Sequence, residues 1–214
     1  MRFRNRVEAG RALGRQMAVG AWTYPLVLAL PRGGVPVAEH VALAIGAQLD
    51  VIVSRKIGSP FNPEMAIGAV GPDGNVVLDQ PLVRRLRVDT EYIENASRLE
   101  LEEIRRRLAA YRGARPLPGL TGRDVVVVDD GIATGYTVMA AVRSLRSNHP
   151  LRLAVATPVC PPSTREWLQQ EVDMVVSLTF PEDFAAVGQF YVDFTQVSDA
   201  EVVEILSRSW KKEN

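Results

Sequence analysis

Cysteine and histidine are scarce in this sequence of 214 residues, which holds one cysteine, Cys160, and two histidines, His40 and His149. A single cysteine excludes a framework of internal disulfide bonds. Two histidines give no support to a histidine-rich metal site or to a zinc site built from two histidines on one helix. Hydrophobic residues make up 47% of the chain, so an apolar core of ordinary size can stabilise it instead.

The chain also lacks net charge and long apolar runs. Lys+Arg 25 balances Asp+Glu 25, so no overall field attracts nucleic acid, and we do not expect a nucleic-acid partner. No apolar run exceeds that of residues 26–30, far short of the roughly 20 residues that span a bilayer. Glu8, Arg11 and Arg15 stand where a signal peptide needs its apolar stretch. We therefore expect a cytoplasmic protein with no membrane contact.

Apolar runs that suit buried strands alternate with helical patterns along the chain, which predicts an α/β fold. The order favours one domain over residues 1–214, with a central parallel β-sheet flanked by helices. Ser198 and Glu201 have the spacing of a capping box and predict a final helix. We expect strands at residues 26–30, 49–54, 125–128, 151–157 and 174–178, and helices at 4–17, 37–45, 137–147 and 163–170.

The middle of the chain predicts a β-hairpin and a long helix. Residues 65–70 and 75–79 flank Gly71-Pro72-Asp73-Gly74, a strong turn sequence. Residues 81–111 are charge-rich with an apolar stripe, which predicts a helix. Residues 55–64 are polar, rich in glycine and proline, and show no period, so we expect an irregular loop there.

The clearest motif follows the apolar strand expected at 125–128, which ends in two carboxylates, Asp129 and Asp130. Thr134, Gly135 and Thr137 come next, just before a predicted helix. Backbone N–H groups at a helix N-terminus, together with hydroxyls and a glycine, form a cradle that suits a phosphate. Two carboxylates beside such a cradle, at the edge of the sheet where α/β proteins bind ligands, indicate a receptor for a phosphorylated sugar.

Two basic motifs follow the ends of the first two strands. Arg32 precedes Gly33 and Gly34, where a planar cation meets residues that allow a ligand to approach the backbone closely. Arg55 and Lys56 follow the second strand, and Lys56 is the only lysine before residue 211. These positions suit a clamp on a pyrophosphate group.

The strand, acidic pair and Thr-Gly-Tyr-Thr loop together resemble the type I phosphoribosyltransferases. The resemblance implies transfer of the 5-phosphoribosyl group from phosphoribosyl pyrophosphate to a nitrogen acceptor, with a nucleobase as the expected acceptor, and release of pyrophosphate. It also implies a flexible loop at the hairpin and a small hood. We expect a core at about residues 20–178 and hood segments at about 1–19 and 179–214.

The resemblance assigns roles to individual residues. Asp129 and Asp130 would hold the ribose hydroxyls and, indirectly, Mg²⁺, the implied cofactor. Arg32 and Lys56 would complete the catalytic set by stabilising the departing pyrophosphate. The expected substrate contacts are Arg32, Gly33, Gly34, Arg55, Lys56, Asp129, Asp130, Gly131, Ala133, Thr134, Gly135, Tyr136 and Thr137. A non-proline cis peptide in the arginine loop and a homodimer are further expectations from the family.

The sequence departs from the family's best-known members at the acceptor site. Ala133 stands where hypoxanthine–guanine enzymes carry an aspartate that contacts the purine, which argues against 6-oxopurines. The long charged part of the expected helix, residues 90–111, matches neither salvage group. Glu64 could assist as a base or contact a magnesium-bound water, although an ordinary loop carboxylate is the simpler reading. The aromatic side chains of the tail could stack on a base or belong to the core: Phe180, Phe184, Phe190, Tyr191 and Phe194.

Three other interpretations remain at this stage. The chain could be a non-catalytic regulator that binds phosphoribosyl pyrophosphate and controls a partner. It could be another α/β fold with an acidic strand end, such as a receiver-like domain, although that pocket does not require the threonine–glycine loop. A phosphoryl-transfer enzyme is disfavoured because the sequence has no Gly-rich loop ending in GK[ST].

Overall fold

A computed structural model describes residues 1–211 and has a five-stranded parallel sheet at its centre. The strands lie in the order β2-β1-β6-β7-β8, and every neighbouring pair is parallel. Their bounds are β1 Leu26–Ala29, β2 Gln48–Val51, β6 Asp124–Val128, β7 Arg152–Val159 and β8 Met174–Thr179. The expected central sheet is confirmed. Residues 212–214, the end of the expected C-terminal hood segment, lie outside the described residues.

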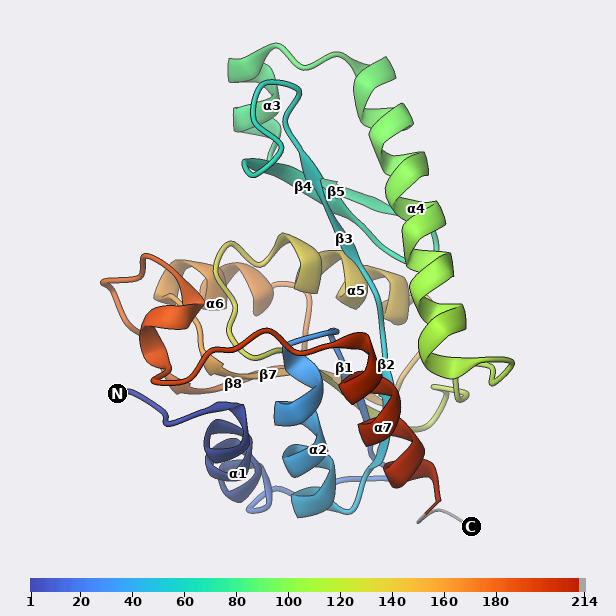
Figure 1. Ribbon diagram of the computed structural model, residues 1–214, viewed down its shortest axis with the longest axis vertical. Helices are drawn as coiled ribbons and strands as arrows, with labels where there is room; N and C mark the ends of the chain where they lie inside the picture. The colour runs from blue at the N-terminus through green and yellow to red at the C-terminus, as the bar shows by residue number, and fades with distance from the viewer. Residues whose placement is uncertain (212–214) are drawn as a thin grey trace.

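Helices cover both faces of the parallel sheet (Figure 1). One face packs against α1 Arg6–Met17, α2 Gly34–Ile45 and α7 Asp199–Trp210, and the other against α5 Tyr136–Arg146 and α6 Pro162–Leu168. Successive strand residues point to opposite faces, so Val126 and Val128 join the first core while Val125 and Val127 join the second. Burial on both faces explains why residues 125–128 of β6 are all valine, with no polar residue among them.

A second, antiparallel sheet consists of β3 Arg55–Gly58, β4 Ala66–Val70 and β5 Val76–Leu78. The β4–β5 hairpin was expected and is confirmed. The expectation of an irregular loop from residue 55 is wrong for β3, which pairs with β4. Ile57 is fully buried opposite Gly68, so tertiary packing makes a strand of a segment whose own sequence has no period.

The helical segment after this sheet is divided in two, where one continuous helix was expected. The two helices are α3 Gln80–Leu86 and α4 Thr90–Arg112. Arg87 has a φ of 50° and ends α3, with its N–H donating to carbonyl oxygens of that helix. Asp89 then accepts a hydrogen bond from the N–H of Tyr92 and begins α4. In Figure 1, α4 runs along the small sheet and descends towards α7.

Other element boundaries move by a few residues. The helix after β1 begins at Gly34, three residues before the expected start at Val37. The predicted final helix is confirmed, and both hydrogen bonds of the Ser198–Glu201 capping box are present. Within residues 1–211, no helix combines the length and the apolar character needed to cross a bilayer.

The two terminal segments meet near the carboxyl ends of the strands. The N–H of Phe3 donates to the carbonyl of Phe190 at 2.8 Å, and the N–H of Val192 donates to the carbonyl of Phe3 at 2.8 Å. A short 3-10 helix, η1 Val187–Phe190, precedes this contact. Phe190 and Tyr191 are buried, so these tail aromatics belong to the core. The joined ends lie near the strand ends, and α1 itself packs on α2.

Candidate functional site

The loops that follow β1 and β6 are in direct contact. The two strands are neighbours in the sheet, so their carboxyl ends meet at one edge. A Cβ atom added to Gly33 would lie 2.1 Å from Oδ2 of Asp130, and one added to Gly34 would lie 2.7 Å from the carbonyl oxygen of Val128. Only glycine leaves room for this approach. The structure therefore brings the loop of Arg32, Gly33 and Gly34, called here the arginine–glycine loop, together with the acidic pair.

The two residues of the acidic pair differ in exposure. Asp130 is 8% exposed, whereas Asp129 is partly exposed. The N–H of Asp130 donates to Oδ1 of Asp129 at 2.8 Å. Burial raises the pKa of Asp129 well above its usual range, and the charge of Asp130 adds to the rise. Burial also raises the pKa of Asp130, and the Arg6 guanidinium opposes that rise.

Arg6 and Tyr191 complete the surroundings of Asp130. Arg6 was not expected at the site, and Tyr191 was expected only as a tail aromatic that stacks on a base or belongs to the core. Nε of Arg6 donates to Oδ2 of Asp130 at 2.7 Å, and Nη1 donates to the carbonyl of Thr195 at 2.7 Å. The guanidinium carbon lies 4.0 Å from the centre of the Phe194 ring. The Tyr191 hydroxyl donates to the carbonyl of Asp130 at 2.6 Å. These partners are distant in the sequence, so no local pattern could have identified them.

The loop after β6 presents the N-terminus of the eleven-residue helix α5. Gly135 has a φ of 80° and precedes the helix, and a Cβ there would lie 2.8 Å from Cγ2 of Thr164. The Thr164 hydroxyl donates to the carbonyl of Ala133 at 2.6 Å and fixes the loop to α6. Ala133 and Thr134 are exposed. Exposed backbone at a helix N-terminus suits an anion such as phosphate.

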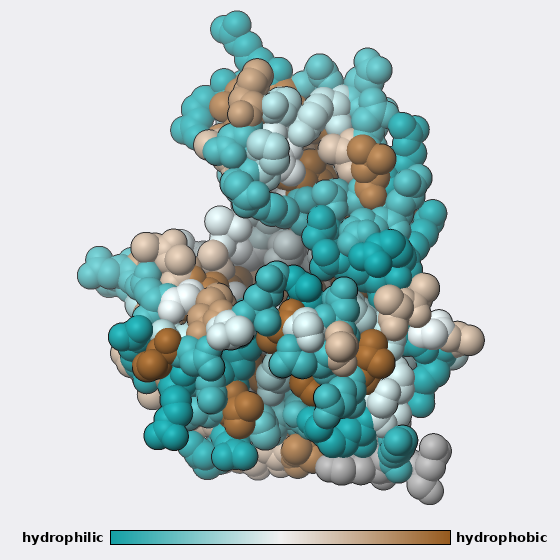
Figure 2. All heavy atoms as spheres, viewed as in Figure 1, coloured by the Kyte–Doolittle hydropathy of each residue, from teal (hydrophilic) through white to brown (hydrophobic). Residues whose placement is uncertain are grey.

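A cavity of about 560 Å³ adjoins this loop. The rings of Tyr136 and Trp167 meet edge to face there, with their centres 5.1 Å apart, and Phe184 lines the same cavity. Nearby, η1 packs closely against Gly131, where an added Cβ would lie 2.3 Å from Val187. The remaining lining residues are Asp79, Ala133, Thr134, Pro161, Ser163, Thr164, Glu182 and Ala185. Figure 2 shows the molecule indented between the part that carries α3 and the parallel sheet.

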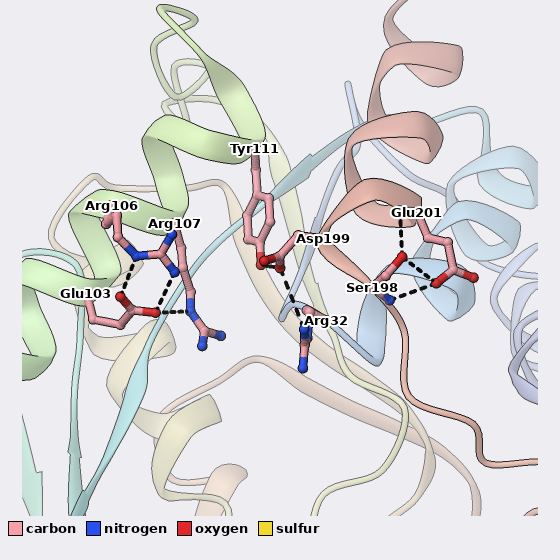
Figure 3. A network of polar contacts seen from close by, with 8 residues as sticks. All are labelled: Arg32, Glu103, Arg106, Arg107, Tyr111, Ser198, Asp199 and Glu201. Atoms are coloured by element: carbon pink, nitrogen blue, oxygen red, sulfur yellow. Dashed lines mark hydrogen bonds and ion pairs between the residues drawn. The ribbon is translucent and has the colours of Figure 1, made fainter.

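Arg32, the arginine of the arginine–glycine loop, lies beside the ends of two helices, α4 and α7. The Pro31–Arg32 peptide is cis, as expected from the family. Nη1 of Arg32 lies 3.9 Å from Oδ1 of Asp199, the first residue of α7. Tyr111 of α4 donates its hydroxyl to the same oxygen (Figure 3). Sequence reasoning missed Asp199 and Tyr111, because nothing in their local patterns indicates that α4 ends beside the start of α7.

Arg55 and Lys56 each pair with a carboxylate. Nε of Arg55 lies 2.7 Å from Oε2 of Glu100 on α4, and Nζ of Lys56 lies 2.8 Å from Oε2 of Glu64. The hydrogen bond from Lys56 lowers the pKa of Glu64. Within residues 1–211, no hydrogen bond or ion pair joins either cation to the acidic pair. The connection just before Arg55 reaches α5, because Ser54 donates to the carbonyl of Thr137 at 2.7 Å.

The carboxylates could hold a magnesium ion only if a bound phosphate supplied further oxygen ligands. Within the described chain, no three His, Cys, Asp or Glu side chains are grouped so that they could hold a metal by themselves. Magnesium commonly keeps several waters and binds one or two carboxylates together with substrate phosphate oxygens. The partly exposed Asp129 fits such a shared site better than Asp130, whose Oδ2 accepts from Arg6.

The fold and the contact between the acidic pair and the arginine–glycine loop agree with the family comparison. The model of the phosphoribosyl transferase domain matches residues 11–195, and the chain belongs to this family. It is 44% identical over 207 residues to a protein of Mycobacterium tuberculosis H37Rv, Rv0571c, which is named as a phosphoribosyl transferase without a stated acceptor. The match covers 97% of this chain and 47% of that protein, so the chain spans about half the length of the curated relatives it matches.

Solved structures agree with this assignment. The TT1426 protein of Thermus thermophilus is similar with a TM-score of 0.81 and 44% identity, covering 97% of this chain and 99% of that one. The AQ2163 protein of Aquifex aeolicus has a TM-score of 0.52 and 13% identity, covering 94% and 84% of the two chains. The second likeness shows the fold alone.

Proposed function

We propose that this protein transfers the 5-phosphoribosyl group of phosphoribosyl pyrophosphate to a nitrogen atom of a nucleobase and releases pyrophosphate. The observation that carries the proposal is the contact of Gly33 with the Asp130 carboxylate. It joins a cationic loop to an acidic pair whose strand continues into the N-terminus of α5. A sugar with phosphate groups on both sides fits this arrangement. Its pyrophosphate can meet the cationic loop, its hydroxyls the acidic pair, and its 5′-phosphate the N-terminus of α5.

Each part of the proposed site has its own role in binding. Asp129 and Asp130 accept hydrogen bonds from the ribose hydroxyls. Residues 131–137 bind the 5′-phosphate through backbone N–H groups and the hydroxyls of Thr134 and Thr137. Arg32 binds the pyrophosphate, and the absence of side chains at Gly33 and Gly34 lets the ligand approach the loop.

The reaction breaks the bond between C1 of the ribose and the pyrophosphate oxygen. Positive charge grows on the sugar ring while the leaving pyrophosphate gains negative charge. Arg32 stabilises this negative charge. Arg55 and Lys56 add to this stabilisation after exchanging their carboxylate partners for the pyrophosphate. Closure of residues 57–64 keeps water from capturing the cationic sugar. A bound Mg²⁺ would neutralise pyrophosphate charge, held through water by Asp129.

The acceptor is proposed to enter the cavity beside Ala133 and Thr134. Its volume of about 560 Å³ suits a flat heterocycle, and Phe184 and Trp167 offer aromatic surface for stacking. Alanine at position 133 leaves no carboxylate there to accept a hydrogen bond from a 6-oxopurine. This supports a nucleobase of another kind.

Pyrophosphate release tests the proposal. The protein is incubated with phosphoribosyl pyrophosphate, Mg²⁺ and a panel of purine and pyrimidine bases. Release that requires one of the bases, and that the Asp129→Asn variant loses, would support the transferase. Binding without release for any base would favour the non-catalytic regulator instead. Light scattering on the same sample tests the homodimer that the family resemblance leads us to expect.

A further inference from the structure

Arg6 and Asp130 form an ion pair in which both side chains are almost buried. The distance from Nε to Oδ2 is 2.7 Å, and the two side chains are 11% and 12% exposed. Gly33 packs against the same carboxylate oxygen. Arg6 and Gly33 both lie against Oδ2, and the side chain of Asp129 also hydrogen-bonds with that of Asp130. We expect a ligand hydroxyl to reach Asp130 at Oδ1, the oxygen farther from Gly33.

Arg6 is held by partners other than Asp130. Its Nη1 donates to the carbonyl of Thr195 at 2.7 Å, and its guanidinium lies over the Phe194 ring. That ring stacks in turn on Tyr191, with the ring centres 5.0 Å apart. A side chain fixed at several points holds its partner in one orientation before any ligand arrives.

The backbone of Asp130 is fixed by the same part of the molecule. The buried Tyr191 donates its hydroxyl to the Asp130 carbonyl at 2.6 Å. Tyr191 is bridged to Phe3, three residues before Arg6. The joined ends of the chain therefore fix the main chain of Asp130 through Tyr191 and its carboxylate through Arg6.

From this arrangement we infer that Arg6 is a positioning residue of the phosphoribosyl site, which orients Asp130 so that Oδ1 accepts a hydrogen bond from a ribose hydroxyl. The inference rests on the proposed function. A carboxylate that is free to rotate must be ordered when the sugar binds, and this ordering weakens binding. Pyrophosphate alone has no sugar, so its binding does not depend on Asp130 or on Arg6.

Calorimetric titration separates these two ligands. Phosphoribosyl pyrophosphate and inorganic pyrophosphate, each with Mg²⁺, are titrated into the wild type, Arg6→Gln, Arg6→Lys and the control Arg11→Gln, which changes an exposed arginine of the same helix. Arg6→Gln should weaken the binding of phosphoribosyl pyrophosphate at least about tenfold, or about 1.4 kcal/mol. The affinity for inorganic pyrophosphate should not change. Arg6→Lys should recover part of the loss, and Arg11→Gln should match the wild type.

Two further variants keep the inference testable. In an Asp130→Asn background, Arg6→Gln should add little further loss, because the residue it acts through is already altered. Phe194→Leu removes the ring that packs against Arg6 at an exposed position, so this variant is expected to fold. It should show the same selective weakening of binding even if Arg6→Gln does not fold.

The inference is overturned if folded Arg6→Gln binds phosphoribosyl pyrophosphate as the wild type does. Tighter binding would also overturn it, since Arg6 would then compete with the sugar for Asp130. Equal weakening of both ligands would overturn it in favour of a general structural role. Failure of the wild type to bind phosphoribosyl pyrophosphate would instead contradict the proposed function.

Discussion

The hydroxyl of Tyr111 donates a hydrogen bond of 2.5 Å to Oδ1 of Asp199, the oxygen that lies 3.9 Å from Nη1 of Arg32 (Figure 3). Tyr111 stands near the end of α4 and Asp199 at the start of α7. One carboxylate therefore connects two helices to the arginine–glycine loop. On the same helix, Glu103 accepts hydrogen bonds from Arg106 and Arg107.

Replacing Tyr111 by phenylalanine should lower the free energy of unfolding by about 1 kcal/mol, because the ring still fills its buried place while the hydrogen bond is lost. Burial and the hydrogen bond to Asp199 raise the pKa of Tyr111 to about 12. The neutral hydroxyl therefore stabilises the fold fully below about pH 10, the ordinary value, and this contribution disappears as the pH rises towards 12.

Urea unfolding of the wild type and Tyr111→Phe from pH 8 to pH 11.5 checks this expectation. The difference between the two proteins should shrink above pH 10. A difference that stays constant over the whole range would show that the Tyr111 hydroxyl does not titrate as expected.

Gly33→Ala should damage ligand binding as well as stability. The new Cβ would lie 2.1 Å from Oδ2 of Asp130, so the loop or the carboxylate must move. We expect a loss of stability of about 1–3 kcal/mol, typical of overpacking, together with a clear loss of affinity for phosphoribosyl pyrophosphate. Gly119→Ala is the matched control, because a Cβ at that position meets no atom within 4 Å. Stability and affinity that are the same in Gly33→Ala and Gly119→Ala would contradict the close packing of the loop against Asp130.

The ion pair of Arg112 and Asp50 should stabilise the fold far more than an exposed ion pair does. Nε lies 2.7 Å from Oδ1, and the side chains are 9% and 2% exposed. Arg112→Gln leaves a buried carboxylate without its cation and should cost about 3 kcal/mol of stability. Arg143→Gln, which breaks an exposed pair with Glu171, should cost less than about 1 kcal/mol. Chemical denaturation measures both, and similar losses would contradict the role assigned to burial.

The centre of the candidate site could be predicted because its parts follow strand ends. Asp129 and Arg32 come after neighbouring parallel strands, whose carboxyl ends meet at one edge of the sheet. The capping box at Ser198 was equally visible, because its hydrogen bonds join residues three apart.

The contacts around that centre could not be predicted in the same way. Arg6 and Asp130 are 124 positions apart, and Arg6 occupies an ordinary place at the start of a helix. The division between α3 and α4 depends on a left-handed conformation at Arg87, which this residue type does not favour. β3 is polar, and its pairing with β4 makes it a strand. In each case the tertiary structure decides what the local sequence leaves open.

Calorimetric titration of phosphoribosyl pyrophosphate with Mg²⁺ into the wild type and Asp129→Asn tests the central claim most directly. Asp129 is the better target of the acidic pair, because replacing Asp130 would also remove the buried partner of Arg6. We predict saturable binding to the wild type and at least about tenfold weaker binding to the variant, with both proteins folded. A folded wild type that binds no phosphoribosyl pyrophosphate, or a variant that binds it equally well, would contradict the proposed site.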